Sequence, residues 1–337
     1  MTRNAAYLIL LSTKRKFFSK HVLLLTIFLE DIENIMDLTV NTVIDSEKCT
    51  GCGLCIEVCP YGTLSMVDGK VCVTGEISLN CGHCVAVCPV SAVRVTTLEP
   101  LQFLSFSMEN DWIKHGKDDT GHLVQLMASR RSCRNFMNKP VDINILEDLV
   151  TIGTTAPTGS NSQEWTFTIL PDRTQIEIFG ENVVTFLKKL NRMAQIAPLR
   201  KALCLFGKAE LELYHKRYFK RIEELTRNWQ THKKDMLFWN AQSIILVGAT
   251  EAATCPQEDA MLATQNILLA AHAMGLGTCL ISFAVQALAR DKSIGKSLGL
   301  ASGEKIYSVI TIGWPDEHYH KIIPRKKIIP HYTNMNS

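Results

Sequence analysis

Residues 49–60 read Cys49-Thr-Gly-Cys52-Gly-Leu-Cys55-Ile-Glu-Val-Cys59-Pro60, and this stretch decides what the first part of the chain folds around. A second run reads Cys81-Gly-His-Cys84-Val-Ala-Val-Cys88-Pro89, and eight residues separate Cys72 from Cys81. Eight of the twelve cysteines therefore fall within forty residues. Soft thiolate ligands at this density and spacing predict iron–sulfur clusters.

The spacing assigns these cysteines to two 4Fe-4S clusters. Three closely spaced cysteines bind one cube, whereas the cysteine that follows after three residues and precedes a proline binds the other cube. The two predicted ligand sets are Cys49, Cys52, Cys55 and Cys88 for the first cluster and Cys59, Cys72, Cys81 and Cys84 for the second. Glycines beside the ligands let the backbone turn tightly, so that its N–H groups can face the sulfur atoms.

A disulfide framework or a zinc site would be the ordinary explanation for so many cysteines. Disulfide scaffolds occur in secreted proteins, and zinc sites use two cysteine pairs or a mixture of cysteine and histidine. Neither explains a C-x2-C-x2-C-x3-C-P run that occurs almost twice, so we favour clusters.

Residues 41–98 resemble bacterial-type two-cluster ferredoxins through these motifs. The resemblance implies a ferredoxin-like module with two 4Fe-4S clusters that transfers electrons. The second motif departs from the simplest pattern because Cys72 stands far ahead of Cys81. Cys72 is thus the least typical of the eight ligands.

Length and composition suit about two domains with a full core, since the chain has 337 residues and is 46% hydrophobic. The net charge of +3 hides an asymmetry: residues 1–36 carry +2, residues 37–110 carry −5 and residues 111–337 carry +6. An acidic cluster module is thus joined to a mildly basic domain. The basic residues form no stripe interleaved with aromatics, which argues against nucleic-acid binding.

Free ligand thiols need a reducing compartment, so the sequence predicts a cytoplasmic protein. Two apolar runs within residues 1–36 flank Lys14-Arg-Lys16, and each is too short to span a bilayer, so no transmembrane segment is expected. A targeting or membrane-surface role for residues 1–36 stays open. We favour Met36 as the start of the folded protein, with residues 1–36 as an extension outside the fold.

The remaining pattern predicts the order of the domains. The cluster module should occupy residues 37–98, with alternating strands at 38–44 and 92–97 that pair. A polar connector follows over residues 99–121. Residues 122–330 alternate helices and apolar strands, which predicts an α+β domain.

Capping residues and apolar runs locate the main elements of this α+β domain. Strands are expected at residues 165–170, 243–249 and 306–313. Helices are expected at 123–131, after the cap Asp142, and from Pro256 to Gly275, with residues 182–240 mostly helical.

Residues 130–134 read Arg-Arg-Ser-Cys-Arg and close a predicted helix with three cations and a hydroxyl. Guanidinium groups bind phosphate oxygens through two hydrogen bonds at once, so the stretch suggests a bound anion. The helix dipole alone also favours cations at a helix C-terminus, and the stretch by itself does not decide between the two explanations.

This stretch and three others together resemble the nitroreductase-like FMN family. Residues 156–165, Ala-Pro-Thr-Gly-Ser-Asn-Ser-Gln-Glu-Trp, resemble its A-P-S-x-x-N-x-Q-P-W signature, with Glu164 in place of the proline. Residues 259–278 resemble its central helix and Gly-Leu-Gly turn. Residues 312–315 and 324–326 resemble its last strand and basic tail, and the four matches stand in the family's order.

The resemblance implies a homodimer with FMN at the subunit interface. The residues at the phosphate and ribityl end would be Arg130, Ser132 and Arg134, with Arg325 or Lys326 from the tail. The residues at the isoalloxazine would be Thr158 and Gly159, supported by Asn161 and Gln163. The backbone near N5 of the ring would be that of Ile281 and Ser282.

Several other conspicuous residues are expected to be structural. His272 lies inside an apolar helix, where a histidine is usually part of the core. The four cysteines outside the cluster motifs lack metal spacing and are expected in buried packing: Cys133, Cys204, Cys255 and Cys279. The aromatic residues between 214 and 239 are expected in the core, with a substrate lid as the second interpretation.

The sequence thus predicts an iron–sulfur flavoprotein oxidoreductase that passes electrons from the clusters to FMN and on to an electron-poor acceptor, such as a nitroaromatic or a quinone. The expected donor is a low-potential protein or NAD(P)H, and no side chain is predicted to be catalytic. Three alternatives remain open. One is a non-catalytic electron carrier or redox sensor, and another is a reductase of one specific enone or halogenated metabolite. The third, which the resemblance implies, is a domain that consumes its own flavin.

Overall fold

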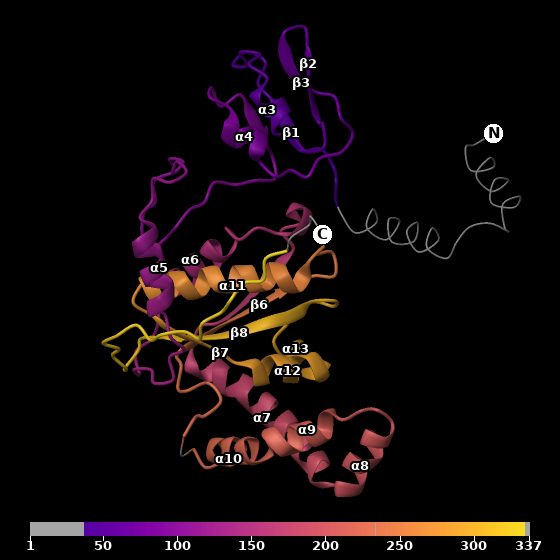
Figure 1. Ribbon diagram of the computed structural model, residues 1–337, viewed down its shortest axis with the longest axis vertical. Coiled ribbons are helices and arrows are strands. Elements are labelled where there is room, and N and C mark those ends of the chain that lie inside the picture. Colours follow the sequence, from indigo (N-terminus) through magenta and orange to yellow (C-terminus); the bar gives the residue numbers. More distant parts are fainter. Residues whose placement is uncertain (1–36, 233, 334–337) are drawn as a thin grey trace, which may run out of the picture. The chain divides into compact units, whose positions relative to one another are not determined.

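The computed structural model describes residues 37–232 and 234–333 (Figure 1). The predicted extension, residues 1–36, lies outside the described residues. The chain forms two compact units. The first contains the residues up to Leu101 together with Pro157–Trp165 and Ala249–Asp259, and the second contains the rest. The sequence had placed both of these later segments in the α+β domain.

Two antiparallel strand pairs frame the first unit. β1 (Thr42–Ile44) pairs with β4 (Val93–Val95), which holds the two ends of the cysteine-rich segment together, as the alternating patterns predicted. β2 (Leu64–Val67) and β3 (Lys70–Val73) form a hairpin that the sequence analysis did not predict. Residues 68–69, Asp-Gly, make its turn with φ of 49° and 76°, the left-handed values that such a two-residue turn requires.

One short helix follows the start of each cysteine motif. α3 (Leu54–Glu57) begins after Gly53 at φ 80°, and α4 (His83–Val87) begins after Gly82 at φ 73°. Glycine adopts these left-handed angles without the steric cost that other residues incur. The two motifs therefore share one local backbone conformation.

A four-stranded sheet in the order β5-β6-β8-β7 organises the second unit. Its strands are β5 (Trp165–Leu170), β6 (Ser243–Ala249), β8 (Lys305–Gly313) and β7 (Gly277–Leu280). Every residue of β6 is buried, as expected of a strand that is covered on both faces. The sequence predicted β5, β6 and β8, whereas the short strand β7 was expected only as a turn.

Helices cover both faces of this sheet (Figure 1). α6 (Ile143–Gly153) and α11 (Pro256–Ala273) lie on one face, and α7 (Arg173–Gln195) and α12 (Ser282–Arg290) lie on the other. The helix α6 begins at the predicted cap, where the carboxylate of Asp142 accepts a hydrogen bond from the N–H of Asn144. The protein has the predicted α+β fold.

Three further helices extend the layer formed by α7: α8 (Ala197–Leu205), α9 (Glu210–Arg217) and α10 (Phe219–Gln230). Trp229 and Phe238 are buried there and pack edge to face, with 6.2 Å between their ring centroids. These two aromatics belong to the core, as predicted, whereas Tyr218, which was also expected there, is exposed. Within residues 37–232 and 234–333, no helix is long and apolar enough to cross a membrane.

Asp148, a fully buried residue of α6, fixes the start of the connector. Its carboxylate accepts hydrogen bonds from the N–H groups of Leu104 and Ser105, both at 2.7 Å. Burial alone would raise the pKa of Asp148, but these bonds and the Ser105 hydroxyl outweigh it and lower the pKa. The remaining helices of the second unit are α5 (Thr120–Ser129) and α13 (Lys292–Ser297).

Candidate functional site

The first thiol group lies in the first unit and draws on both cysteine motifs. It consists of four cysteines: Cys49, Cys52, Cys55 and Cys88. Burial raises the pKa of the Cys55 thiol, and the neighbouring charges of Cys52, Cys88 and Cys49 raise it further. The structure thus places Cys88 beside three cysteines from which it is remote in sequence.

Backbone N–H groups point at the sulfur atoms of this group. Hydrogen bonds from the N–H groups of Val71 and Gly51 lower the pKa of the Cys49 thiol. The N–H of Ala92 donates to Sγ of Cys88 at 3.2 Å. Gly51 is required at its position because its φ is 72° and an added Cβ would lie 2.1 Å from the carbonyl oxygen of Gly69. Such donors stabilise sulfur that carries negative charge.

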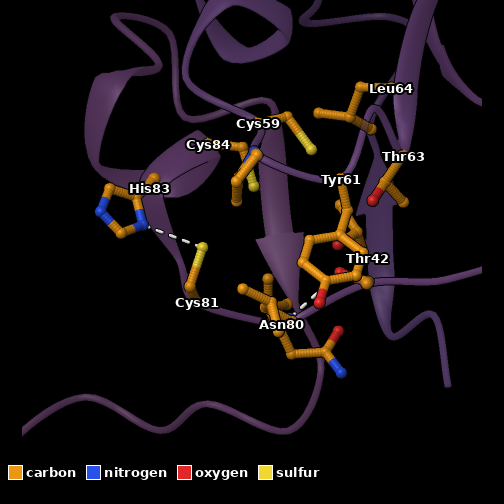
Figure 2. A pocket seen from close by; sticks show the side chains of 13 residues that line it. Thr42, Cys59, Tyr61, Thr63, Leu64, Asn80, Cys81, His83 and Cys84 are labelled. Atoms are coloured by element: carbon orange, nitrogen blue, oxygen red, sulfur yellow. Dashed lines mark hydrogen bonds between the residues drawn. The ribbon is translucent and has the colours of Figure 1, made fainter. Parts of the chain in front are cut away.

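The second thiol group consists of Cys59, Cys81 and Cys84, which line one pocket (Figure 2). Burial raises the pKa of the Cys84 thiol, and the nearby charges of Cys81 and Cys59 add to this effect. Burial also acts to raise the pKa of the Cys59 thiol, but hydrogen bonds from Thr63 and from neighbouring backbone N–H groups lower it overall. His83 Nδ1 lies 2.8 Å from Sγ of Cys81, a contact drawn in Figure 2.

Cys72 does not line this pocket, although the sequence assigned it to the second cluster. It lies on β3, directly opposite Ser65 of β2 in the hairpin. Ser78 lines the pocket instead and is only 7% exposed. The sequence analysis missed Ser78, but a signal was present: Ser78 precedes Cys81 by the same three positions that separate Cys49 from Cys52.

Both thiol groups suit clusters better than single ions. Among residues 37–232 and 234–333, no three His, Cys, Asp or Glu side chains gather closely enough to hold one metal ion. A cube binds its ligands at four separate corners, so it takes thiols that are too far apart to share one ion. The thiols and the N–H groups directed at them fit an iron–sulfur cluster.

The loop that precedes β5 also belongs to the first unit. It contains a 3-10 turn, Gly159–Asn161, and three non-glycine residues with left-handed φ: Ser160 at 52°, Asn161 at 54° and Gln163 at 51°. Such angles are costly for these residues and persist where the surroundings fix them. The loop therefore holds a defined and strained conformation.

Three hydrogen bonds fix the loop. The N–H of Gly159 donates to Oδ1 of Asp259 at 3.0 Å, and the N–H of Gln163 donates to Oγ1 of Thr158 at 3.1 Å. The Thr250 hydroxyl donates to the Glu164 carboxylate at 2.6 Å, so the residue that replaces the family's proline is anchored. The sequence analysis missed Asp259 as an anchor, because its contact spans a hundred residues of chain.

Asn161 ties this loop to the second thiol group. Its side-chain Nδ2 donates to the carbonyl oxygens of Leu79 at 3.0 Å and Asn80 at 3.3 Å. Asn80 is the residue immediately before Cys81. The loop is thus hydrogen-bonded to the two residues that immediately precede Cys81, a member of the second thiol group.

A basic pocket of about 390 Å³ lies in the second unit, where α5 ends. Burial lowers the pKa of the Arg130 guanidinium, and the nearby positive charges of Arg131 and Arg325 lower it further. No ion pair in the described ranges joins these three arginines to a carboxylate. Glu317 also lines this pocket, but its basic side chains outnumber that one carboxylate, and such an excess of cations suits an anion.

The segment after Arg130 runs beside β7. Ser132 forms a parallel bridge with Thr278, and the N–H of Cys133 donates to the carbonyl oxygen of Thr278 at 2.8 Å. An added Cβ at Gly277 would lie 2.7 Å from the Cys133 side chain, so only glycine permits this approach. Oγ1 of Thr278 is buried without a hydrogen-bond partner in the structure.

The structure places the other predicted flavin residues of the second unit as follows. Ile281 is buried, and its N–H donates to the carbonyl oxygen of Val309 at 2.9 Å, so this N–H is committed to the protein. Ser282 is exposed and is the first residue of α12. Arg134 is exposed and close enough to Cys279 to lower the pKa of that thiol, although burial raises it overall. Lys326 is exposed on the C-terminal segment.

Two of the structural expectations need correction. His272 is half-buried and lines the basic pocket rather than the core. Cys204 is exposed and Cys255 is half-buried, whereas Cys133 and Cys279 are buried as predicted. Burial raises the pKa of the Cys133 thiol to about 12, which fits a packing role.

Two family models match the sequence. Residues 127–314, more than half of the chain, match the Nitroreductase family. Residues 42–65 match the 4Fe-4S binding domain.

Curated relatives and solved structures are similar to parts of the chain. Iodotyrosine deiodinase of Haliscomenobacter hydrossis is 38% identical over 48 residues, and iodotyrosine deiodinase 1 of Pongo abelii is 24% identical over 87 residues. These matches cover 14% and 24% of this chain and 22% and 29% of those proteins, so the chain spans less than a third of the curated relatives' length. A solved nitroreductase with bound FMN from Desulfitobacterium hafniense DCB-2 is 20% identical, with a TM-score of 0.47 over 62% of this chain and 97% of that chain.

Proposed function

Because this chain belongs to the nitroreductase family and residues 42–65 match a 4Fe-4S binding domain, we propose that it is an iron–sulfur flavoprotein oxidoreductase. It passes electrons from 4Fe-4S clusters to FMN and on to an electron-poor small molecule. The observation that carries this proposal is the pair of hydrogen bonds from Asn161 to the segment before Cys81. They join the loop that resembles the family's flavin-binding signature to a thiol group.

The two thiol groups hold the clusters. Each draws ligands from both motifs, with Cys88 completing the first group and Cys59 belonging to the second. The N–H groups directed at Cys49, Cys59 and Cys88 stabilise the charge of the ligands. The free thiols of this unit need a reducing compartment, so we propose that the protein is cytoplasmic.

The basic pocket supports the phosphate end of FMN. Arg130 and Arg325 lie close together, and Ser132, Arg134 and Lys326 are near them in the chain, so this region offers cations and a hydroxyl to a phosphate. Arginine binds phosphate through two hydrogen bonds at once, so this pocket favours a phosphate over a single monovalent anion.

Two further segments serve the ring end of the flavin. The strained loop with Thr158, Gly159, Asn161 and Gln163 gives a rigid surface, which positions a ligand better than a loose loop does. Since the N–H of Ile281 is committed to Val309, the backbone donor at this end is that of Ser282. When bound, FMN accepts electrons singly and delivers them in pairs.

The acceptor is an electron-poor small molecule, such as a nitroaromatic or a quinone. A halogenated aromatic is the second candidate, because both curated relatives are iodotyrosine deiodinases. The donor is a low-potential electron-carrier protein or NAD(P)H, and the protein acts as a homodimer. A non-catalytic electron carrier would show no saturation with any small-molecule acceptor.

Anaerobic turnover separates these candidates. Reconstituted full-length protein receives reduced ferredoxin as the donor, with a nitroaromatic, a quinone or an iodophenol as the acceptor. Saturable consumption of one acceptor, with FMN retained after many turnovers, is the expected result. Absence of saturation with all three, while electrons still pass to a second protein, would replace the enzyme with an electron carrier.

A further inference from the structure

The cysteine and proline positions of the two motifs repeat twenty-nine residues apart, with one exception. The equivalent positions that agree are Cys52 and Cys81, Cys55 and Cys84, Cys59 and Cys88, and Pro60 and Pro89. The exception is the first ligand position, where Cys49 is matched by Ser78. The repeat therefore places a hydroxyl where the first motif has a thiol.

The structure repeats in the same register. Gly53 and Gly82 have φ of 80° and 73° before their helices, and Gly51 and Asn80 both have left-handed φ, 72° and 50°. Asn80 thus adopts the left-handed conformation that glycine adopts at the equivalent position of the first motif. The backbone around Ser78 follows that of the first ligand in the first motif.

Hydrogen bonding at the two positions is also equivalent. The N–H of Gly51, two residues after Cys49, is directed at the Cys49 sulfur. The N–H of Asn80, two residues after Ser78, donates to Oγ of Ser78 at 3.1 Å. In both motifs the backbone N–H two residues further along the chain thus bonds to the side-chain atom of this position.

Ser78 also has the location that a ligand needs. Its side chain is 7% exposed and lines the pocket together with Cys59, Cys81 and Cys84. Its own N–H is fixed by the carbonyl oxygen of Leu38 at 2.9 Å. Cys72 lies outside this pocket, on the hairpin opposite Ser65.

We propose that Ser78, rather than Cys72, is the fourth ligand of the second cluster, which is bound by three thiolates and one serine oxygen. The proposal rests on the proposed function, since it concerns one of that protein's clusters. Iron–sulfur clusters prefer soft thiolate ligands, so the iron atom at the oxygen corner is held less firmly than the other three. The second cluster thus has one labile corner, whereas the first has four thiolates.

A mild oxidant reveals a labile corner. Ferricyanide takes one electron from a [4Fe-4S]²⁺ cluster, which releases one Fe²⁺ and leaves [3Fe-4S]⁺, and the freed Ser78 oxygen takes a proton from water. The three-iron product is paramagnetic, whereas [4Fe-4S]²⁺ is silent. Electron paramagnetic resonance and iron counting therefore report on the corner without any assay of activity.

The test compares four full-length proteins, each reconstituted anaerobically and then treated with two equivalents of ferricyanide per chain, one for each cluster. The wild type should develop one three-iron signal per chain and fall from about eight to about seven iron atoms, as expected for two four-iron clusters of which one has a labile corner. Ser78→Cys should abolish the signal and keep all the iron. Cys72→Ser should match the wild type, and Cys49→Ser, the mirror change in the first motif, should about double the signal.

Two outcomes would overturn the assignment of Ser78. In the first, Cys72→Ser loses iron before any oxidation. In the second, Ser78→Cys releases iron as readily as the wild type, with its FMN absorbance intact as a check on folding. Absence of iron–sulfur absorption in all four proteins would instead overturn the proposed function, because no cluster would then be present to have a corner.

Discussion

Asp148 and Asp259 are both buried acids, and their surroundings shift their pKa values in opposite directions. Burial acts to raise the pKa of Asp148, but hydrogen bonds from Ser105 and Leu104 lower it overall. Burial raises the pKa of Asp259, and the hydrogen bonds from the N–H groups of Gly159 and Cys255 do not compensate. Asp148 therefore stabilises the fold as an anion. Asp259 holds the loop at Gly159, but burial of its carboxylate costs solvation free energy.

Replacing Asp148 with Asn should destabilise the protein by about 1.5–3 kcal/mol at neutral pH, because the amide cannot accept all the bonds that the carboxylate accepts. The folded pKa lies below the unfolded value of about 3.9. The wild-type advantage is therefore full above that value and is lost as the pH falls through the folded pKa. Denaturant unfolding of both proteins between neutral and acidic pH measures the difference.

The control for this prediction is Glu147→Gln, an exposed neighbour on the same helix, which should change stability little. A gap between wild type and Asp148→Asn that stays constant down to the lowest pH would contradict the role given to the carboxylate charge.

Arg130 lies close to Arg131 and Arg325 in the basic pocket, so its removal tests the anion site. Arg130→Ala should weaken FMN binding by about 1.5–3 kcal/mol, a factor of about ten to a hundred and fifty. Fluorescence titration of the apoprotein with FMN measures this affinity. Arg221→Ala removes an exposed arginine that pairs with Glu224 and should leave the affinity unchanged. Equal FMN affinity of Arg130→Ala and wild type would move the phosphate elsewhere.

At the scale of elements, local signals in the sequence predicted more than contacts between distant segments. The cap at Asp142, the proline at the start of α11 and the alternating strands β1 and β4 are read from neighbouring residues, and each is present. The hairpin β2–β3 was not predicted, although its Asp-Gly turn is a strong hairpin signal, because each strand has only four residues and Cys72 in β3 was assigned to a cluster.

The candidate site divides in the same way. The cysteine spacing and the arginine cluster are local patterns, and the sequence analysis found them. The bond from Asn161 to Leu79 and the bond from Gly159 to Asp259 join segments about eighty and a hundred residues apart, and no local pattern encodes such pairs. Ser78 was missed for another reason. It occupies the position that Cys49 has in the first motif, but the cluster motif is defined by cysteines, so a serine does not match it.

Each motif is proposed to supply its last cysteine, which follows α3 or α4, to the cluster of the other motif, and this gives a prediction at the scale of elements. Cys88→Ala should remove the first cluster, although Cys49, Cys52 and Cys55 are unchanged. Cys59→Ala, the equivalent change in the first motif, should remove the second cluster instead. Iron content should fall by about four atoms in each variant, as expected for the loss of one four-iron cluster.

Oxidation with ferricyanide distinguishes the two variants. The three-iron signal, which belongs to the second cluster, should persist in Cys88→Ala and vanish in Cys59→Ala. The reverse pattern would refute the crossed assignment of the ligands.

At the scale of the whole molecule, the chain joins an acidic module rich in thiols to a basic domain of the nitroreductase family. The loop at residues 157–165 belongs to the first unit, although it lies within the sequence of the second. Within the first unit, two hydrogen bonds from Asn161 connect this loop to the residues just before Cys81. The central claim is therefore that electrons enter at the clusters and leave from the flavin.

The most direct test follows the bleaching of FMN absorbance in a stopped-flow experiment without oxygen. Wild type and Cys84→Ala, both loaded with FMN, are mixed either with reduced ferredoxin or with NADH. Reduced ferredoxin should bleach the wild-type flavin rapidly and the flavin of Cys84→Ala much more slowly, while NADH should act on both alike. Equal bleaching of the two proteins by reduced ferredoxin would contradict the account, because the flavin would then receive its electrons without the clusters.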